Sequence, residues 1–344
     1  MKRIDFYFDP IFGISLAGDG WNLCQINMIC TAPTKLLTIA FMRFLFLLLL
    51  LSPATCFSDQ ITLHFIKAPT PTRWDSPRRL TLSALRNQIA KVPGGSRHSI
   101  GHVFVELQCG NAPVVYSGVT STGNSEERRA IFLQGYGMGV VFKNYRGKFD
   151  SQDFIEKDLS AMFETGRSNF VRFEIKESTC ERLTRYLSEY ERLGYHKIYA
   201  GLNARPLLRQ SAGCSAYGMS FLELAGLQHP EFEENWRTYR IVPRKWVGGP
   251  LTGNRVNILK ILTAIPSRWD EDLSRGGFPV DFWDPEKMHL WTELATRDLM
   301  ASANRKFPWP ASLLQIQKST GVLFDARGVP TPTGSFFRDP QAKI

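Results

Sequence analysis

The segment SAGCSAYGMSFLELAGL, residues 211–227, places a cysteine where small residues give way to a long apolar run. After Cys214 the apolar side chains fall on nearly all faces of a helix, which predicts a helix buried in the centre of a domain. Gly226 is a typical C-terminal stop for it. Because the first turn of a helix stabilises a thiolate, Cys214 is a candidate nucleophile. A buried core residue and half of a disulfide are the alternatives.

The chain before this helix predicts a sheet with helices packed on it. Polar and apolar residues alternate in HSIGHVFVELQC, which is typical of a strand with His102 and Phe104 on one face and Val103 and Val105 on the other. Strands are also expected at 61–69, 114–121, 130–145 and 170–177, and helices at 80–90 and behind a capping box of Ser178 and Glu181. The order of these elements predicts an α+β domain over residues 59–229.

Residues 230–344 differ in texture, with six of the eight tryptophans and many prolines. Asp284 and Pro285 are typical of the start of a helix, as N-cap and first-turn residue. We expect an aromatic- and Pro-rich C-terminal extension or subdomain that covers part of the first domain.

A nucleophilic cysteine needs a base, usually histidine, held by a third group. His102 is a lone polar residue early in an apolar strand, so it is the preferred candidate, although a core histidine would look the same. Glu106 lies about 13 Å further along the strand, too far to orient His102. A hairpin centred between Gly110 and Ala112 would place Thr120 or Ser121 opposite His102, as the orienting residue.

Residues 42–58, MRFLFLLLLLSPATCFS, have the charge, apolar core and break of a secretory signal peptide. Met42 is then the expected start, and residues 1–41 are upstream read-through. The apolar run is shorter than the roughly 20 residues of a spanning helix, so we expect no stable membrane span after signal removal. The expected location is periplasmic or secreted.

The mature chain would carry 38 Lys and Arg against 29 Asp and Glu, without a polybasic tract or a nucleic-acid-binding motif. An anionic envelope polymer or lipid surface suits this charge better than nucleic acid. No metal or cofactor motif is visible in the sequence. Three cysteines remain after cleavage behind Ser58, namely Cys109, Cys180 and Cys214, and whether the first two form a disulfide is open.

Taken together, SIGHVFVEL (99–107) and YAGLNARPLLRQSAGCSAYGMSFLELAG (199–226) resemble the circularly permuted papain-like proteins. These include the NlpC-type cell-wall peptidases and the lecithin–retinol acyltransferases, in which histidine precedes cysteine. The likeness covers about residues 60–228. It implies an antiparallel sheet with a buried Cys-bearing helix, Cys214 as nucleophile, His102 as base and Tyr199 lining the site. Gly213 departs from the Asn that commonly precedes the cysteine.

The resemblance implies an exported cysteine hydrolase that cleaves an amide bond through a thioacyl-enzyme, with a cell-wall peptide as the leading substrate. An acyl-lipid substrate, for an acyltransferase or thioesterase, is the first alternative. A non-catalytic envelope-binding protein is the second. A catalytic thiolate would have a pKa below the ordinary value of about 8.5.

Overall fold

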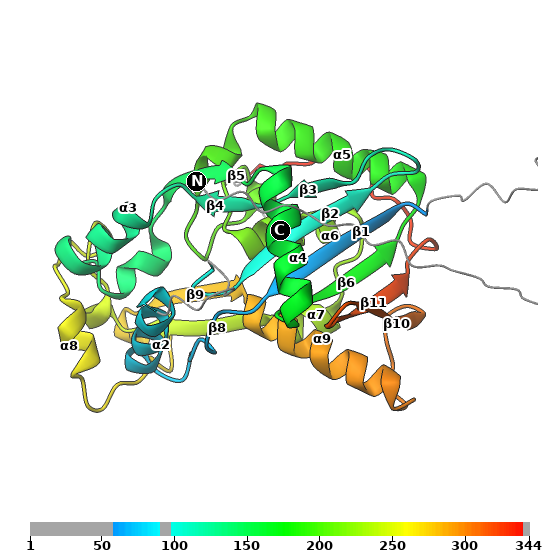
Figure 1. Ribbon diagram of the computed structural model, residues 1–344. Coiled ribbons are helices and arrows are strands. Elements are labelled where there is room, and N and C mark those ends of the chain that lie inside the picture. The colour runs from blue at the N-terminus through cyan, green and yellow to red at the C-terminus, as the bar shows by residue number, and fades with distance from the viewer. Residues whose placement is uncertain (1–57, 90–97, 340–344) are drawn as a thin grey trace, which may run out of the picture. The chain divides into compact units, whose positions relative to one another are not determined.

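A six-stranded sheet in the order β10-β11-β6-β1-β2-β3 forms the centre of the structure, a computed structural model (Figure 1). The structure describes residues 58–89 and 98–339. The expected read-through segment, and the expected signal peptide except for Ser58, lie outside these residues. The strands of the sheet are β1 (Gln60–Ile66), β2 (His102–Gln108), β3 (Val115–Ser117), β6 (Ser168–Glu174), β10 (Ala311–Ile316) and β11 (Ser319–Asp325).

The resemblance implies an antiparallel sheet, but the observed sheet is mixed. β1 pairs antiparallel with β2 and with β6, but β11 adds to β6 in parallel. Two smaller sheets pair β4 (Val119–Ser121), β5 (Tyr145–Phe149) and β7 (Ile198–Tyr199), and β8 (Arg237–Val242) with β9 (Phe278–Trp283). The fold class is therefore α+β, as predicted.

The alternation predicted for β2 is confirmed, and it divides the core between the two faces of the sheet. Val103, Val105 and Leu107 belong to the larger core, to which α5 (Glu177–Arg192), α6 (Cys214–Leu224) and α9 (Pro285–Met300) contribute. Phe104 belongs to a smaller core with α4 (Gln152–Thr165). The other α-helices in residues 58–89 and 98–339 are α2 (Pro77–Ile89), α3 (Asn124–Arg128), α7 (Pro230–Trp236) and α8 (Ile258–Leu262).

Three local predictions were wrong. Residues 114–121 do not run as one strand: β3 pairs with β2, whereas β4 turns away to pair with β5. Residues 130–145 form short helical turns at Arg129–Leu133 and Met138–Phe142, and a strand begins only at Tyr145. The helix α5 begins at Glu177 after Lys176, and Ser178 is no cap, since its hydroxyl hydrogen-bonds Thr331.

The C-terminal residues are part of the same architecture. β10 and β11 extend the central sheet, and α9 contributes Met288, Trp291 and Ala295 to its larger core. Asp284 caps α9, its side chain accepting a hydrogen bond from Glu286 N–H, with Pro285 at the first turn, as predicted. The six-stranded sheet and its larger core therefore contain residues from both sides of the boundary expected after residue 229.

Cys109, just after β2, and Cys180 on α5 form a disulfide. This bond joins the sheet to the helix that packs on its larger core. Of the cysteines in the described residues, Cys214 is the free one. No helix in the described part of the chain is long and apolar enough to cross a membrane.

Candidate functional site around Cys214

Cys214 is the first residue of α6, with Gly213 as N-cap in an extended conformation. The side chain is buried, as predicted for this helix. Three donors face the sulfur: the hydroxyl of Tyr199, at 3.6 Å, and the backbone N–H groups of Val103 and Ser215. Each can donate a hydrogen bond to a thiolate, so these three groups favour the charged form of the sulfur.

Burial opposes these donors. Loss of solvent is the largest influence on the Cys214 thiol and raises its pKa above the ordinary value, although the Tyr199 hydroxyl and the two amides lower it. The negative charge of Asp150 raises the pKa further. The expectation of a lowered thiol pKa is therefore not met.

Tyr199 is the last residue of β7, and its hydroxyl donates to the Cys214 sulfur. Burial raises its pKa well above the ordinary range, and the neighbouring Cys214 adds to the effect. The phenol consequently keeps its proton at any physiological pH. It is a permanent hydrogen-bond donor beside the sulfur.

His102 begins β2, next in sequence to Val103, whose amide faces the Cys214 sulfur. No hydrogen bond joins the imidazole to Cys214. Its Nε2 atom lies 4.0 Å from Oδ2 of Asp150, the residue that follows β5. Both side chains are almost completely buried, and neither of these two atoms has a hydrogen-bond partner within the described residues. Asp150 is therefore the candidate for the group that orients His102.

Burial acts in opposite directions on this pair. It lowers the pKa of His102 well below the ordinary value, an effect to which the nearby His98 adds. It raises the pKa of Asp150 to about 6. At neutral pH His102 is therefore a neutral imidazole that can accept a proton, and Asp150 is ionised.

A second histidine lies against the first. The ring of His98 stacks on that of His102 with centroids 3.9 Å apart, and its Nε2 atom lies 3.2 Å from Oδ2 of Asp158 on α4. Phe104 closes the other side of His102 with an edge contact. The imidazole of His102 is thereby held in one orientation by two rings.

Thr120 and Ser121 are not opposite His102, because β4 leaves the hairpin. They pair with Lys148 and Gly147 of β5. The hydroxyl of Ser121 instead donates a 2.5 Å hydrogen bond to Glu127. Glu127, which the sequence did not single out, lines a cavity with Cys214 and Tyr199.

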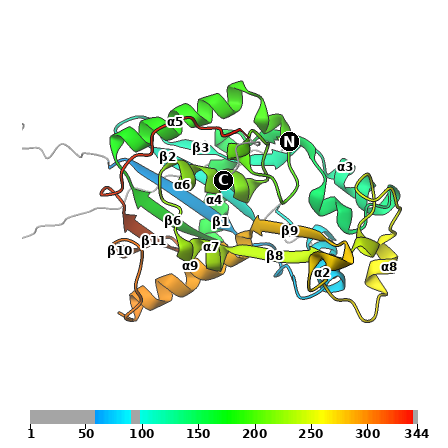
Figure 2. The same cartoon turned by 180° about the vertical axis from the view of Figure 1, so that it is seen from behind.

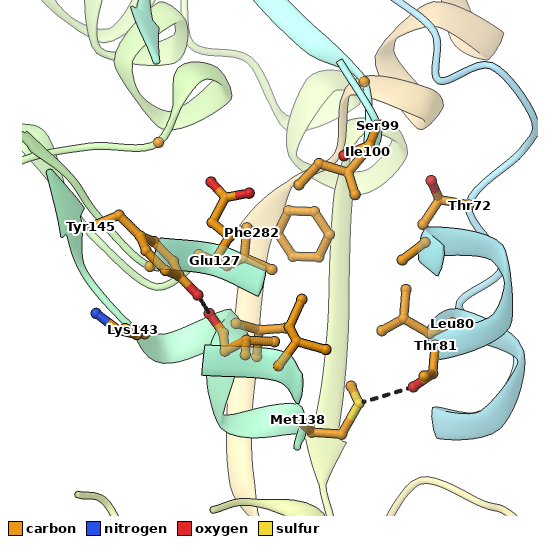
Figure 3. Close-up of a pocket in the computed structure, with 18 of the residues that line it drawn as sticks. Thr72, Leu80, Thr81, Ser99, Ile100, Glu127, Met138, Lys143, Tyr145 and Phe282 are labelled. Carbon is orange, nitrogen blue, oxygen red and sulfur yellow. Dashed lines mark hydrogen bonds between the residues drawn. The ribbon is translucent and has the colours of Figure 1, made fainter. Parts of the chain in front are cut away.

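This cavity has a volume of about 210 Å³ and a mainly apolar wall. Figure 3 shows its central part, where Thr81 of α2 faces Met138 and the carboxylate of Glu127 points inward. Of the other charged side chains in the wall, Lys143 pairs with Glu126 and Asp284 caps α9. The apolar wall is formed by Trp74, Leu80, Leu85, Ile100, Ile131, Met138, Val140, Val141, Leu202, Ile258 and Phe282.

The cavity brings together segments far apart in the sequence. Cys214, Tyr199 and Gly213 form one part of the wall, and α2 forms another. His102 is not among the lining residues, and its ring packs against His98 and Phe104, on the face of β2 opposite to the side chain of Val103. The structure therefore places a thiol, a hydroxyl donor and a carboxylate at one apolar cavity.

One group of residues in the described part of the chain has metal-ligand types close together, namely Asp59, Cys109 and Cys180. Both cysteines are joined in the disulfide, so neither offers a thiolate to a metal. Asp59 accepts a hydrogen bond from Gly110 N–H. This cluster therefore surrounds the disulfide that joins the sheet to α5.

Comparison with protein-family models, with curated proteins and with solved structures finds no match.

Proposed function

We propose that this protein is an exported cysteine hydrolase that cleaves an amide bond through a thioacyl-enzyme, with Cys214 as nucleophile. The observation that carries the proposal is the environment of the sulfur: Cys214 opens a buried helix at a cavity, with the Tyr199 hydroxyl and two backbone amides facing it. Such donors stabilise a thiolate, and near the reacting carbon they stabilise an oxyanion. The permuted papain-like arrangement of histidine before cysteine belongs to the same proposal.

The chemistry follows from the protonation states. Neutral His102 takes the thiol proton, the sulfur bonds to the carbonyl carbon, and the C–N bond breaks as the amine leaves with that proton. Water then attacks the thioester, returns the free thiol and releases a carboxylic acid. His102 and Cys214 are not hydrogen-bonded, and the imidazole packs on Phe104, on the face of β2 opposite to Val103. Proton transfer therefore requires the imidazole to move toward the sulfur when substrate binds. Ionised Asp150 would stabilise the imidazolium that forms between the two transfers.

Export is supported by the disulfide between Cys109 and Cys180, because such bonds persist mainly in oxidising compartments. The periplasm or the extracellular space is accordingly the proposed location. A cell-wall peptide, favoured by the resemblance, is the proposed substrate class.

The apolar wall of the cavity favours a second candidate, an acyl-lipid thioesterase or acyltransferase. Moving a hydrocarbon chain from water to such a wall is favourable, whereas moving the charged groups of a peptide there is unfavourable. In this case the thioacyl-enzyme forms from an ester or thioester, and Cys214 keeps its role. A non-catalytic binding protein would use the same cavity without turnover.

Product analysis separates these candidates. Purified protein is incubated with peptidoglycan fragments and, separately, with acyl-lipid esters and thioesters, and the products are identified by mass spectrometry. The proposal expects new peptide fragments with the wild type and none with Cys214→Ser. Fatty acid release that needs Cys214 would favour the lipid candidate. Turnover of neither class would favour the binding protein.

A further inference from the structure

Three segments come together at one end of the structure, beside the main sheet (Figures 1 and 2). They are α2, residues 124–142 and residues 249–268, and we name them together the α2–α3–α8 lobe. The Nε of Arg78 donates to the carbonyl of Leu262 at 2.8 Å, and Arg255 donates to the carbonyl of Leu133 at 2.6 Å. These contacts tie the three segments into one surface.

The outside of the lobe carries large apolar side chains exposed to solvent. Ile265 is 85% exposed, Leu133 66% and Leu259 62%. The others are Leu82, Phe132 and Leu251. Isolated exposed apolar residues are ordinary, but six on one small lobe indicate an interaction surface.

The charge of the lobe is one-sided. Its three segments contain eight Lys and Arg against two Glu. Glu126 is paired with Lys143, and Glu127 faces the cavity, so neither offsets the outer cations. Cations interleaved with exposed leucine, isoleucine and phenylalanine match the chemistry of an anionic lipid surface.

The same backbone segments build both the lobe surface and the cavity wall. Ile131 lines the cavity and Phe132 next to it is exposed, and the same holds for Ile258 and Leu259. Ile100 lines the cavity and is itself 44% exposed, which places it at the opening. A surface that held the lobe would therefore adjoin the cavity.

We propose that the α2–α3–α8 lobe docks on the surface of an anionic lipid bilayer. The exposed apolar side chains enter the boundary between headgroups and acyl chains, and Arg129, Lys260 and Arg268 lie at the lipid phosphates. An anionic polymer would satisfy the cations and leave the apolar side chains in water, so the bilayer is the better partner. The docking does not require that Cys214 be a nucleophile.

The test measures partition of the mature chain into sedimented vesicles. Phosphatidylglycerol–phosphatidylethanolamine vesicles are compared with pure phosphatidylcholine vesicles at low and high salt. The expected result is binding to the anionic vesicles that high salt weakens at least about tenfold, because the surface potential is screened. Equal binding to both vesicle types, or to neither, overturns the proposal.

Variants locate the surface. One variant combines Phe132→Asn, Leu133→Asn and Leu259→Asn, and a second combines Arg129→Gln and Lys260→Gln. Each should weaken binding by about tenfold or more. The matched control is Leu290→Asn with Leu294→Asn, two exposed leucines on α9 outside the lobe, which should bind as the wild type does. Thermal melting checks that each variant is folded. Unchanged binding by both folded lobe variants refutes the assignment, and Cys214→Ser should bind fully whatever its activity.

Discussion

At the scale of single residues, the buried pair of His102 and Asp150 is the feature with the clearest consequences. A carboxyl whose pKa is raised in the folded state binds its proton more tightly there than in the unfolded chain. Asp150 therefore contributes most to stability below its ordinary pKa, and this contribution is lost as the pH rises toward about 6. His102, with a lowered pKa, has the opposite sign, since the unfolded chain takes up its proton below about pH 6.5.

Asp150→Asn should separate these two effects. Without the carboxyl, the variant should gain stability relative to the wild type by up to about 3 kcal/mol between pH 4 and pH 7, since a raised pKa of about 6 corresponds to roughly two units. Urea unfolding at several pH values measures the difference. Asp153→Asn, at an exposed position on α4, is the control and should show little pH dependence. A difference between Asp150→Asn and wild type that stays constant from pH 4 to pH 7 contradicts the account.

Tyr199→Phe removes the side-chain donor that faces Cys214 while keeping the ring. Since a hydrogen bond to a charged group is worth about 1.5–3 kcal/mol, the Cys214 pKa should rise by at least about one unit. Iodoacetamide labelling at a fixed pH near 8 should then slow about tenfold, with the site identified by mass spectrometry. Tyr145→Phe, another phenol at the cavity, should label at the wild-type rate. Equal rates in all three proteins would show that the Tyr199 hydroxyl does not act on the sulfur.

At this scale local patterns in the sequence singled out Cys214 and His102, and the resemblance to the permuted papain-like proteins added Tyr199. Both missed Asp150 and Glu127, which lie in segments without such a pattern. The backbone N–H of Asp150 donates to the carbonyl of Gly118, the residue between β3 and β4, and so holds Asp150 beside the hairpin that carries His102. That contact depends on tertiary structure and leaves no periodicity to read.

At the scale of elements, the break between β3 and β4 decides the surroundings of His102. The predicted hairpin was right for β3, which pairs Ser117 with Val105, and wrong beyond it. Gly118 stands at the break against the ring of Phe104, where an added Cβ would lie 2.5 Å from Cδ1. The turn signal of residues 110–113 predicted the hairpin, but the sequence has no local signal for a strand that changes sheets.

Gly118→Ala should therefore destabilise the protein. Phe104 is fully buried, so its ring has little room to move, and such overpacking typically costs about 1–3 kcal/mol. The free energy of unfolding in urea measures this cost. Gly328→Ala, where no atom lies within 4 Å of the added Cβ, should be nearly neutral. If both variants unfold at the same urea concentration as the wild type, the close approach is not a constraint.

At the scale of the whole molecule, residues 230–339 contribute to the six-stranded sheet, to its larger core and to the cavity wall. β11 extends the sheet beside β6, and Ile258 and Phe282 belong to the cavity wall. The tryptophans and the start of α9 were readable from composition and capping residues. The parallel addition of β11 was not, because the pairing of strands about 150 residues apart depends on tertiary packing, not on local pattern.

Phe324 of β11 provides a point test of this integration. It is fully buried and stacks on Phe173 of β6 with ring centroids 5.3 Å apart. Phe324→Ala should cost about 3–5 kcal/mol, the usual loss for a large buried aromatic, as measured by urea unfolding. Leu313→Ala on the partly exposed strand β10 should cost less than about 1 kcal/mol. A small effect at both positions would mean that the C-terminal strands add little to the stability of the sheet.

Cys214 is proposed to form a covalent acyl intermediate, and mass spectrometry of the digested protein tests this most directly. The protein is mixed with the p-nitrophenyl ester of a short fatty acid, quenched in acid and digested. The account predicts one acyl group on the peptide that contains Cys214, removed by hydroxylamine and absent from folded Cys214→Ser. Ester turnover that persists unchanged in Cys214→Ser, or the lack of any adduct at Cys214 in folded wild-type protein, would contradict it.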